Sequence, residues 1–242
     1  MGTGKTKRIF LWSGPRNIST ALMYAFAQRS DTKVYDEPLY GYYLSHTEAK
    51  EYHPGSKEIL ETMEHDGDKV VKMMLTTTEK PIVFFKNMCH HLLDLDRSFM
   101  AQGENVILTR EPVEMLSSFG EVIDNPQMHD VGYKSQVDLM HDLISRGIPV
   151  TVVDSKTILM DPSRQLESLC HKLGISFSPE MLSWSAGARE EDGIWAPYWY
   201  SNVHRSTGFA PYKPKERPFP EKLRSLLDDC QPFYEELMKF SL

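Results

Sequence analysis

The sequence predicts one three-layer α/β domain, in which a parallel sheet is covered by helices on both faces. Short apolar segments alternate along the chain with segments whose apolar residues recur at helical spacing. The short segments are hydrophobic on both sides, as the strands of a covered parallel sheet are. The 242 residues are 40% hydrophobic and 25% charged, which are ordinary globular values. No internal repeat is present, so we expect a single domain over 1–242.

The first half of the chain supplies three of the predicted strands. Residues 8–13 are apolar and stop at a Gly-Pro pair, which predicts a buried strand. Residues 19–29 then follow a helical pattern. Residues 33–36 form a short second strand, and 56–65 an exposed amphipathic helix. Residues 81–86 are rich in β-branched and aromatic side chains, which favours a third strand.

The second half repeats the alternation. Residues 105–109 are a fourth strand, followed by a helix over 112–123 that has Pro at its first position. Residues 133–146 are helical and end at a glycine. Residues 149–153 are the fifth strand, and 162–173 a further helix.

The last part of the chain is less regular. Residues 185–215 contain Gly, Pro and three aromatic-rich clusters, and they are long for a structureless loop, so we expect them to serve a function or to be partly disordered. Residues 220–240 then predict a C-terminal helix or helix pair.

Charge and cysteine content exclude several classes of protein. The net charge is -7, so a basic nucleic-acid-binding face is not expected. Cys89, Cys170 and Cys230 are odd in number and widely spaced, which favours reduced thiols in a cytoplasmic protein. No apolar run is long enough for a membrane span, and no secretory signal is visible. Gly2 fits the short N-myristoylation pattern.

A loop after the first strand has the features of an anion site. It lies at the carboxyl end of a parallel strand and leads into a helix N-terminus, where unpaired N–H groups favour an anion. Arg16 adds a permanent positive charge. A turn followed by a helix cap would give the same residues without function. The loop lacks the Gly-Lys pair of a Walker A motif. The candidate contacts are Gly14, Pro15, Arg16, Asn17, Ser19 and Thr20.

This loop resembles the 5′-phosphosulfate-binding loop of the sulfotransferases, which use 3′-phosphoadenosine 5′-phosphosulfate (PAPS) as sulfuryl donor. The resemblance implies that Arg16 contacts the phosphate–sulfate bridge, and that Ser19 and Thr20 hold the 5′-phosphate. At Asn17 and Ile18 many members have Ser-Gly, and Ile18 does not share the freedom of glycine to adopt a positive φ. The resemblance also implies the P-loop-like topology of that family.

Two later segments extend the resemblance. Arg110 follows the fourth strand and Ser118 comes eight residues later, which is the spacing of the family's 3′-phosphate motif. Arg205 and Gly208 look like the late basic-plus-glycine loop that closes over the nucleotide, although the family more often has Arg-Lys-Gly. As isolated features, all of these could equally be surface or loop residues.

The resemblance implies sulfuryl transfer to a hydroxyl or amine of a small-molecule acceptor, with catalysis by positioning and charge stabilisation. Arg16 and Lys86 are the candidate cations. The proton acceptor remains open among His90, His91 and Glu37, because the family's Lys-x-His spacing is altered here. His91 is weakly preferred.

An aromatic set could line the acceptor pocket, or could simply pack. No metal is required and no ligand spacing is present. A nucleotide-dependent kinase is the alternative, but it would need a Walker A lysine. A catalytically inactive nucleotide-binding relative is the third possibility, and a homodimer is left open. No pyridoxal-phosphate signature is present, and the arginine loop argues against an aminotransferase. The aromatic set is Tyr40, Tyr42, Tyr43, Trp195, Tyr198, Trp199 and Tyr200.

Overall fold

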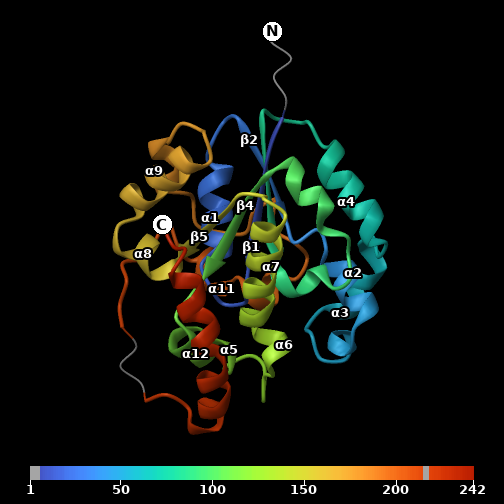
Figure 1. The fold of residues 1–242 in the computed structure, drawn as a ribbon, viewed down its shortest axis with the longest axis vertical. Helices are drawn as coiled ribbons and strands as arrows, with labels where there is room; N and C mark the ends of the chain where they lie inside the picture. The colour runs from blue at the N-terminus through green and yellow to red at the C-terminus, as the bar shows by residue number, and fades with distance from the viewer. Residues whose placement is uncertain (1–5, 215–217) are drawn as a thin grey trace.

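A computed structural model describes residues 6–214 and 218–242; the predicted modification site Gly2 lies outside them. In these residues, five strands form one sheet in the order β2-β3-β1-β4-β5, and every neighbouring pair is parallel (Figure 1). All five predicted strands are confirmed, with ends that shift by a few residues at most. The strands are β1 (Lys7–Ser13), β2 (Thr32–Asp36), β3 (Ile82–Met88), β4 (Glu104–Thr109) and β5 (Val150–Asp154).

Helices connect the strands. The α-helices are α1 (Ser19–Ala27), α2 (Tyr40–His46), α3 (Ser56–Thr62), α4 (Gly67–Thr76), α5 (Pro112–Phe119), α6 (Met128–Val131), α7 (Tyr133–Ser145), α8 (Ser155–Met160), α9 (Pro162–Lys172), α10 (Ala196–Trp199), α11 (Ser201–His204) and α12 (Arg224–Met238). The 3-10 helices are η1 (Glu48–Glu51), η2 (Cys89–Leu92), η3 (Arg97–Gln102), η4 (Pro179–Leu182) and η5 (Glu221–Leu223). The predicted C-terminal pair is therefore η5 followed by α12.

Each face of the sheet has its own core, because successive strand residues point to opposite faces. Ile9 and Leu11 of β1 pack with α1, α8 and α9 on one face. Phe10 and Trp12 pack with α4, η3 and α7 on the other. Figure 1 shows α1, α8 and α9 on one side of the sheet and α4 and α7 on the other. The three-layer α/β arrangement predicted from the apolar strands is confirmed.

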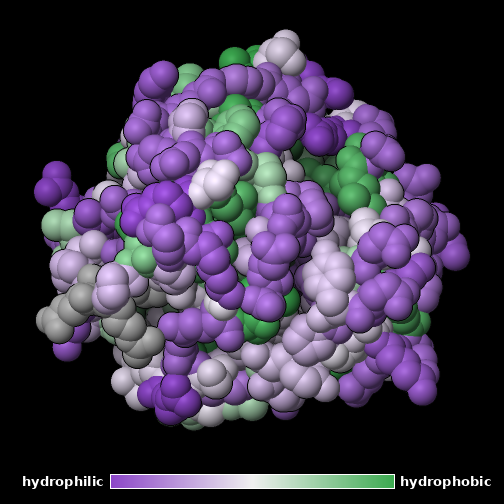
Figure 2. Space-filling model, turned by 90° about the horizontal axis from the view of Figure 1, so that it is seen from below, coloured by the Kyte–Doolittle hydropathy of each residue, from purple (hydrophilic) through white to green (hydrophobic). Residues whose placement is uncertain are grey.

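The strand register aligns the chemistry-bearing residues at one edge. Ser13, the last residue of β1, is level with Met88 of β3 and Leu108 of β4. Asp36, the last residue of β2, pairs in register with Lys86. The loops that follow β1, β2, β3 and β4 therefore leave the sheet together at its carboxyl edge, where ligands bind in such folds. Figure 2 shows the face that lies at the bottom of Figure 1, and on this face apolar residues are visible between polar ones.

Several helices differ from the sequence expectation. The helix predicted over 112–123 ends at Phe119, and that over 56–65 ends at Thr62. Helices α2, α4 and α8 were not predicted, since α2 is a short aromatic stretch and α8 follows β5 without a linker. The segment 185–215 contains α10 and α11, and it is joined to η4 by a bridge between Ser183 and Gly208.

Candidate functional site

The loop between β1 and α1 is shaped by three close contacts. A Cβ on Gly14 would lie 2.9 Å from the carbonyl oxygen of Val131, so this position has room only for glycine. The Asn17 amide donates to the Leu108 carbonyl at 2.8 Å, and the Ser19 backbone N–H donates to Asn17 Oδ1 at 3.3 Å. Asn17 thereby ties the loop to β4 and opens α1. Its side chain has a structural task in addition to any ligand contact.

The loop does not need a glycine at Ile18. Ile18 has φ −81°, an ordinary value, and the left-handed residue of the loop is Arg16, with φ 52°. A non-glycine residue in that region costs roughly 1 kcal/mol or more and persists only where its surroundings fix it. The left-handed residue of this loop is thus two residues before Ile18, and an isoleucine fits where many members of the family have glycine.

Arg16 and Arg110 meet at the carboxyl edge of the sheet. Arg110 Nη1 donates to the Arg16 carbonyl oxygen at 2.8 Å, and Arg16 Nε donates to Ser118 Oγ at 3.1 Å. Arg110 also forms an ion pair with Glu114 at 3.1 Å. Burial and the neighbouring Arg110 lower the pKa of Arg16, against a smaller opposing effect of Glu121. Two guanidinium groups close together and partly buried favour a bound anion.

A cavity of about 320 Å³ joins these residues to the ends of β2 and β3. It brings together most of the residues that the sequence pointed to. Those lining it are Pro15, Arg16, Asn17, Ser19, Thr20, Glu37, Lys86, His90, His91, Arg110, Ser118 and Gly208.

Two predicted contacts do not line this cavity. Gly14 is packed against the backbone of Val131. Arg205 is exposed, and its Nη2 donates to Asn202 Oδ1 at 2.6 Å. A nucleotide contact from Arg205 remains a prediction, and it would require the side chain to turn from Asn202 toward the cavity.

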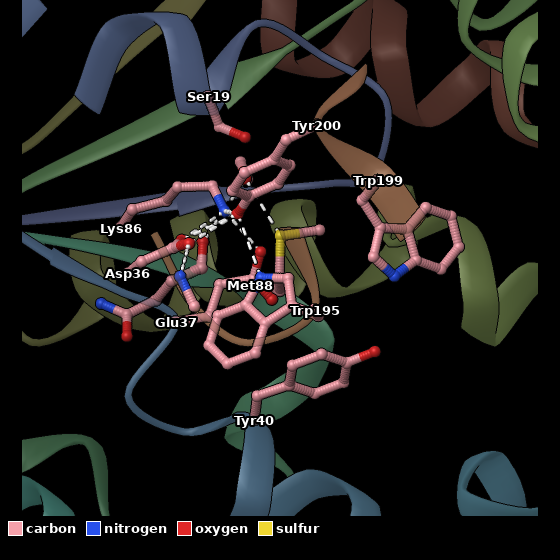
Figure 3. A network of polar contacts seen from close by, with 12 residues as sticks. Ser19, Asp36, Glu37, Tyr40, Lys86, Met88, Trp195, Trp199 and Tyr200 are labelled. Carbon is pink, nitrogen blue, oxygen red and sulfur yellow. Dashed lines mark hydrogen bonds and ion pairs between the residues drawn. The ribbon is translucent and has the colours of Figure 1, made fainter. Parts of the chain in front are cut away.

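Lys86 lies at the floor of the cavity in a buried network. Its Nζ donates to Asp36 Oδ1 at 2.8 Å, to the Tyr200 hydroxyl at 2.8 Å, and to Glu37 Oε1 (Figure 3). Burial alone would lower the pKa of Lys86, but Asp36 and Glu37 outweigh it and raise the pKa. Lys86 is therefore a charged ammonium between the carboxyl groups of Asp36 and Glu37. Burial raises the pKa of Glu37, and the neighbouring Lys86 opposes that rise.

Three histidines line the same cavity and are held uncharged. Burial lowers the pKa of His53 to about 4 and that of His90 to about 3. Burial, with His90 as the next cause, takes the pKa of His91 well below its ordinary value. The ring of His91 lies against the rings of both Tyr40 and Tyr43, with centroid distances of 4.9 and 4.5 Å. At neutral pH each ring is uncharged and has a nitrogen lone pair for a proton, but the apolar surroundings oppose the charged form.

The segment after η4 contributes aromatic residues to the cavity. Trp195, Trp199 and Tyr200 line it, together with Phe209. The Trp199 carbonyl accepts from Arg16 Nη1 at 3.2 Å, which joins this segment to the phosphate loop. Tyr42, Tyr43 and Tyr198, from the aromatic set predicted by sequence, lie outside the cavity lining. His53 and Asp130 line it without any sequence motif that could have indicated them.

The fold and the cavity define the chain as an α/β protein whose ligand site lies at the carboxyl edge of a parallel sheet, beside a basic loop. The profile of the sulfotransferase domain matches residues 7–241. The chain therefore belongs to the sulfotransferase family.

Solved structures support the same fold. The sulfotransferase domain of the Synechococcus PCC 7002 olefin synthase aligns with a TM-score of 0.59 and 17% identity, covering 94% of this chain and 96% of that one. A sulfotransferase from Alicyclobacillus acidocaldarius aligns with a TM-score of 0.54 and 15% identity, covering 96% and 95%. At these identities the likeness shows the fold alone.

Curated relatives carry a different name. The chain is 41% identical over 231 residues to the branched-chain-amino-acid aminotransferase-like protein 2 of Arabidopsis thaliana, and 40% identical to protein 1 of the same name. The alignment covers 95% of this chain but 41% of either relative. The chain thus spans about two fifths of the length of these relatives.

The described residues lack two kinds of feature. They contain no group of three or more His, Cys, Asp or Glu side chains placed to hold a metal ion. They also contain no helix with the length and hydrophobicity needed to cross a membrane.

Proposed function

We propose that this chain binds PAPS and transfers its sulfuryl group to a small-molecule acceptor. The observation that carries the proposal is the meeting of Arg16 and Arg110 at one cavity, joined by the 2.8 Å hydrogen bond from Arg110 to the Arg16 carbonyl. PAPS has a phosphate at each end of its ribose, and an anion at each of these guanidinium groups would match it. Ser118 is within hydrogen-bond distance of Arg16, so it would share one of these anions.

The reaction needs positioned charge more than covalent chemistry. The acceptor oxygen attacks sulfur, the bond from sulfur to the bridging oxygen breaks, and that oxygen leaves with the electron pair on the phosphate. Arg16 is part of the loop after β1, where it would stabilise the charge that builds on the bridging oxygen. The acceptor proton passes to a base.

Lys86 has a different role from the free cation that its position suggested. An ammonium has three protons, and Asp36, Glu37 and Tyr200 accept all three. Lys86 would therefore orient the two carboxylates and the covering segment, with no proton left for the sulfuryl group in this arrangement. Glu37, His90 and His91 stay the candidate bases, because all three line the cavity.

The kinase alternative has less support. A kinase of this topology would need a Walker A lysine, and the loop after β1 has Arg16 in a left-handed conformation instead. The name of the Arabidopsis relatives adds no chemistry to this chain, because the aligned part is a minority of their length.

Calorimetry with the desulfated product, 3′-phosphoadenosine 5′-phosphate (PAP), tests the proposal. We expect PAP to bind more tightly than ATP with Mg²⁺. Arg110→Ala should weaken PAP binding by about 10- to 100-fold, the loss expected for charge-assisted hydrogen bonds. Arg164→Ala, an exposed arginine of α9, is the matched control and should bind like the unmodified chain. ATP with Mg²⁺ binding more tightly than PAP would favour the kinase.

Transfer itself is tested with labelled PAPS and a panel of acceptors. Arg16→Ala should lower transfer by at least about 100-fold, as the loss of a donor to a developing oxyanion does. A chain that binds PAP but transfers to none of the hydroxyl or amine acceptors would be the inactive relative.

A further inference from the structure

The hydrogen-bond network at the floor of the cavity is almost completely satisfied. The Tyr200 hydroxyl accepts from Lys86 at 2.8 Å and from Trp195 Nε1 at 3.1 Å, and it donates to Asp36 Oδ2 at 2.7 Å. Asp36 Oδ2 also accepts from the Gly193 backbone N–H at 3.0 Å. With the three protons of Lys86 used as well, none of these groups has a donor to offer a ligand.

Glu37 is the exception in this network. Lys86 bonds its Oε1, while the described residues give no hydrogen bond to Oε2. Oε2 is not among their fully enclosed unpaired atoms, so it can be reached from the cavity that Glu37 lines. The residue is 8% exposed. A carboxylate that is nine-tenths buried and has one open oxygen requires a hydrogen-bond donor from the ligand.

The charges around this end of the cavity favour a positively charged donor. Glu37 lines it, Asp36 lies behind Glu37, and Lys86 is the one ammonium that pairs with these two carboxyl groups. The histidines nearby are held neutral by burial, which lowers the pKa of His53 and His90. Arg16 reaches the Trp199 carbonyl from the loop after β1, and Arg110 is paired with Glu114. A ligand group that enters here therefore meets an excess of negative charge.

The walls of this end are aromatic. The rings of Tyr40 and Trp195 meet edge to face at 5.0 Å, and both line the cavity, as does Trp199. Figure 3 shows Tyr40, Trp195 and Trp199 beside the Lys86 network. Aromatic faces beside a carboxylate bind ammonium groups by cation–π attraction. His91, 1% exposed, also lines the cavity and keeps Nδ1 without a hydrogen bond from the described residues.

We propose that the acceptor is an amino alcohol whose protonated amine binds between the Glu37 carboxylate and the rings of Tyr40 and Trp195. This proposal rests on the proposed function, since the acceptor is defined by that reaction. An ammonium has no lone pair, so the sulfuryl group goes to a hydroxyl of the same molecule. The hydroxyl oxygen bonds to sulfur, and PAP leaves with the electron pair of the broken bond. Because Glu37 holds the amine, the hydroxyl proton goes to His90 or His91, which line the same cavity.

Equilibrium binding of three probes of one shape tests the proposal without turnover. The probes are 2-phenylethylamine, 2-phenylethanol and phenylacetate, each titrated into the chain saturated with PAP, at a pH where the amine is protonated. We expect the amine to bind at least about tenfold more tightly than the alcohol, which corresponds to about 1.4 kcal/mol, and the carboxylate to bind most weakly.

Glu37→Gln keeps an oxygen for Lys86 and removes the negative charge. It should bring the amine-to-alcohol ratio close to one, while Glu167→Gln, an exposed glutamate of α9, should leave the ratio unchanged. PAP binding of each variant, measured first, reports whether the chain is folded and whether the proposed function holds. Should Glu37→Gln fail to bind PAP, the probe series on the unmodified chain still decides.

Equal or tighter binding of the alcohol or of phenylacetate would overturn the proposal, and so would the absence of binding by all three probes. An amine-to-alcohol affinity ratio that stays unchanged in Glu37→Gln would also overturn it. Absence of PAP binding by the unmodified chain would instead refute the proposed function, so the two failures are distinguishable.

Discussion

Tyr200→Phe should destabilise the chain far more than the loss of one hydroxyl normally does. That hydroxyl accepts from Lys86 and Trp195 and donates to Asp36. Phenylalanine keeps the ring and its packing, but the lysine and the aspartate each lose one hydrogen bond in a site where water cannot replace it. Both side chains are at most 2% exposed.

The expected magnitude follows from the charges involved. A hydrogen bond to a charged group contributes about 1.5–3 kcal/mol, and a buried group left unpaired loses that contribution in full. With two charged partners and the Trp195 N–H affected together, we expect the free energy of unfolding to fall by about 3 kcal/mol. The effects are not additive, since the three partners share one oxygen.

Urea unfolding followed by tryptophan fluorescence and circular dichroism is the assay. The midpoint should move to lower urea with an unchanged slope, because the folded state remains compact. Tyr198→Phe is the matched control, since Tyr198 is half exposed and outside the network. A loss below about 0.5 kcal/mol for Tyr200→Phe, or one equal to that of Tyr198→Phe, would refute the hydrogen-bond accounting.

Three further perturbations test other parts of the structure. Gly14→Ala places a Cβ 2.9 Å from the Val131 carbonyl, so we expect a loss of about 1–3 kcal/mol in urea unfolding and weaker PAP binding; unchanged values for both would contradict the contact. Asn17→Ala removes the hydrogen bond to Leu108, and should cost about 1 kcal/mol in the same assay, with a loss near zero counting against the tie. Burial raises the pKa of Asp154 from 3.8 to about 6, so the folded state binds the proton more tightly and stability should fall as pH rises between these values. Asp154→Asn should flatten that pH dependence by about 3 kcal/mol, and a profile identical to the unmodified chain would refute the assignment.

The fold could be predicted because its strongest signals are local. Five apolar strands separated by helical segments specify a covered parallel sheet, and each strand appears where its pattern indicates. Helices α2 and α8 could not be predicted in the same way. Each is short and is stabilised by tertiary packing, α2 against α3 and α8 against β5 and α9, which the sequence pattern does not encode.

The residues of the site likewise include some that the sequence pattern indicated and contacts that it could not indicate. Arg16, Arg110 and Ser118 were found from spacing after strand ends, and register brings them together. The saturation of Lys86 could not be read from the sequence, because Asp36 and Tyr200 reach it from 50 and 114 residues away. The left-handed conformation of Arg16 was likewise hidden, since local pattern points to Ile18 as the unusual position.

The hydrogen bond from the Arg110 side chain to the Arg16 backbone carbonyl would make the two proposed phosphate positions interdependent. Occupancy of one should rigidify the other, so a nucleotide carrying a single phosphate would receive less than half of the full binding free energy. By the same reasoning, the penalties of Arg16→Ala and Arg110→Ala should overlap, and the doubly substituted chain should lose less affinity than their sum.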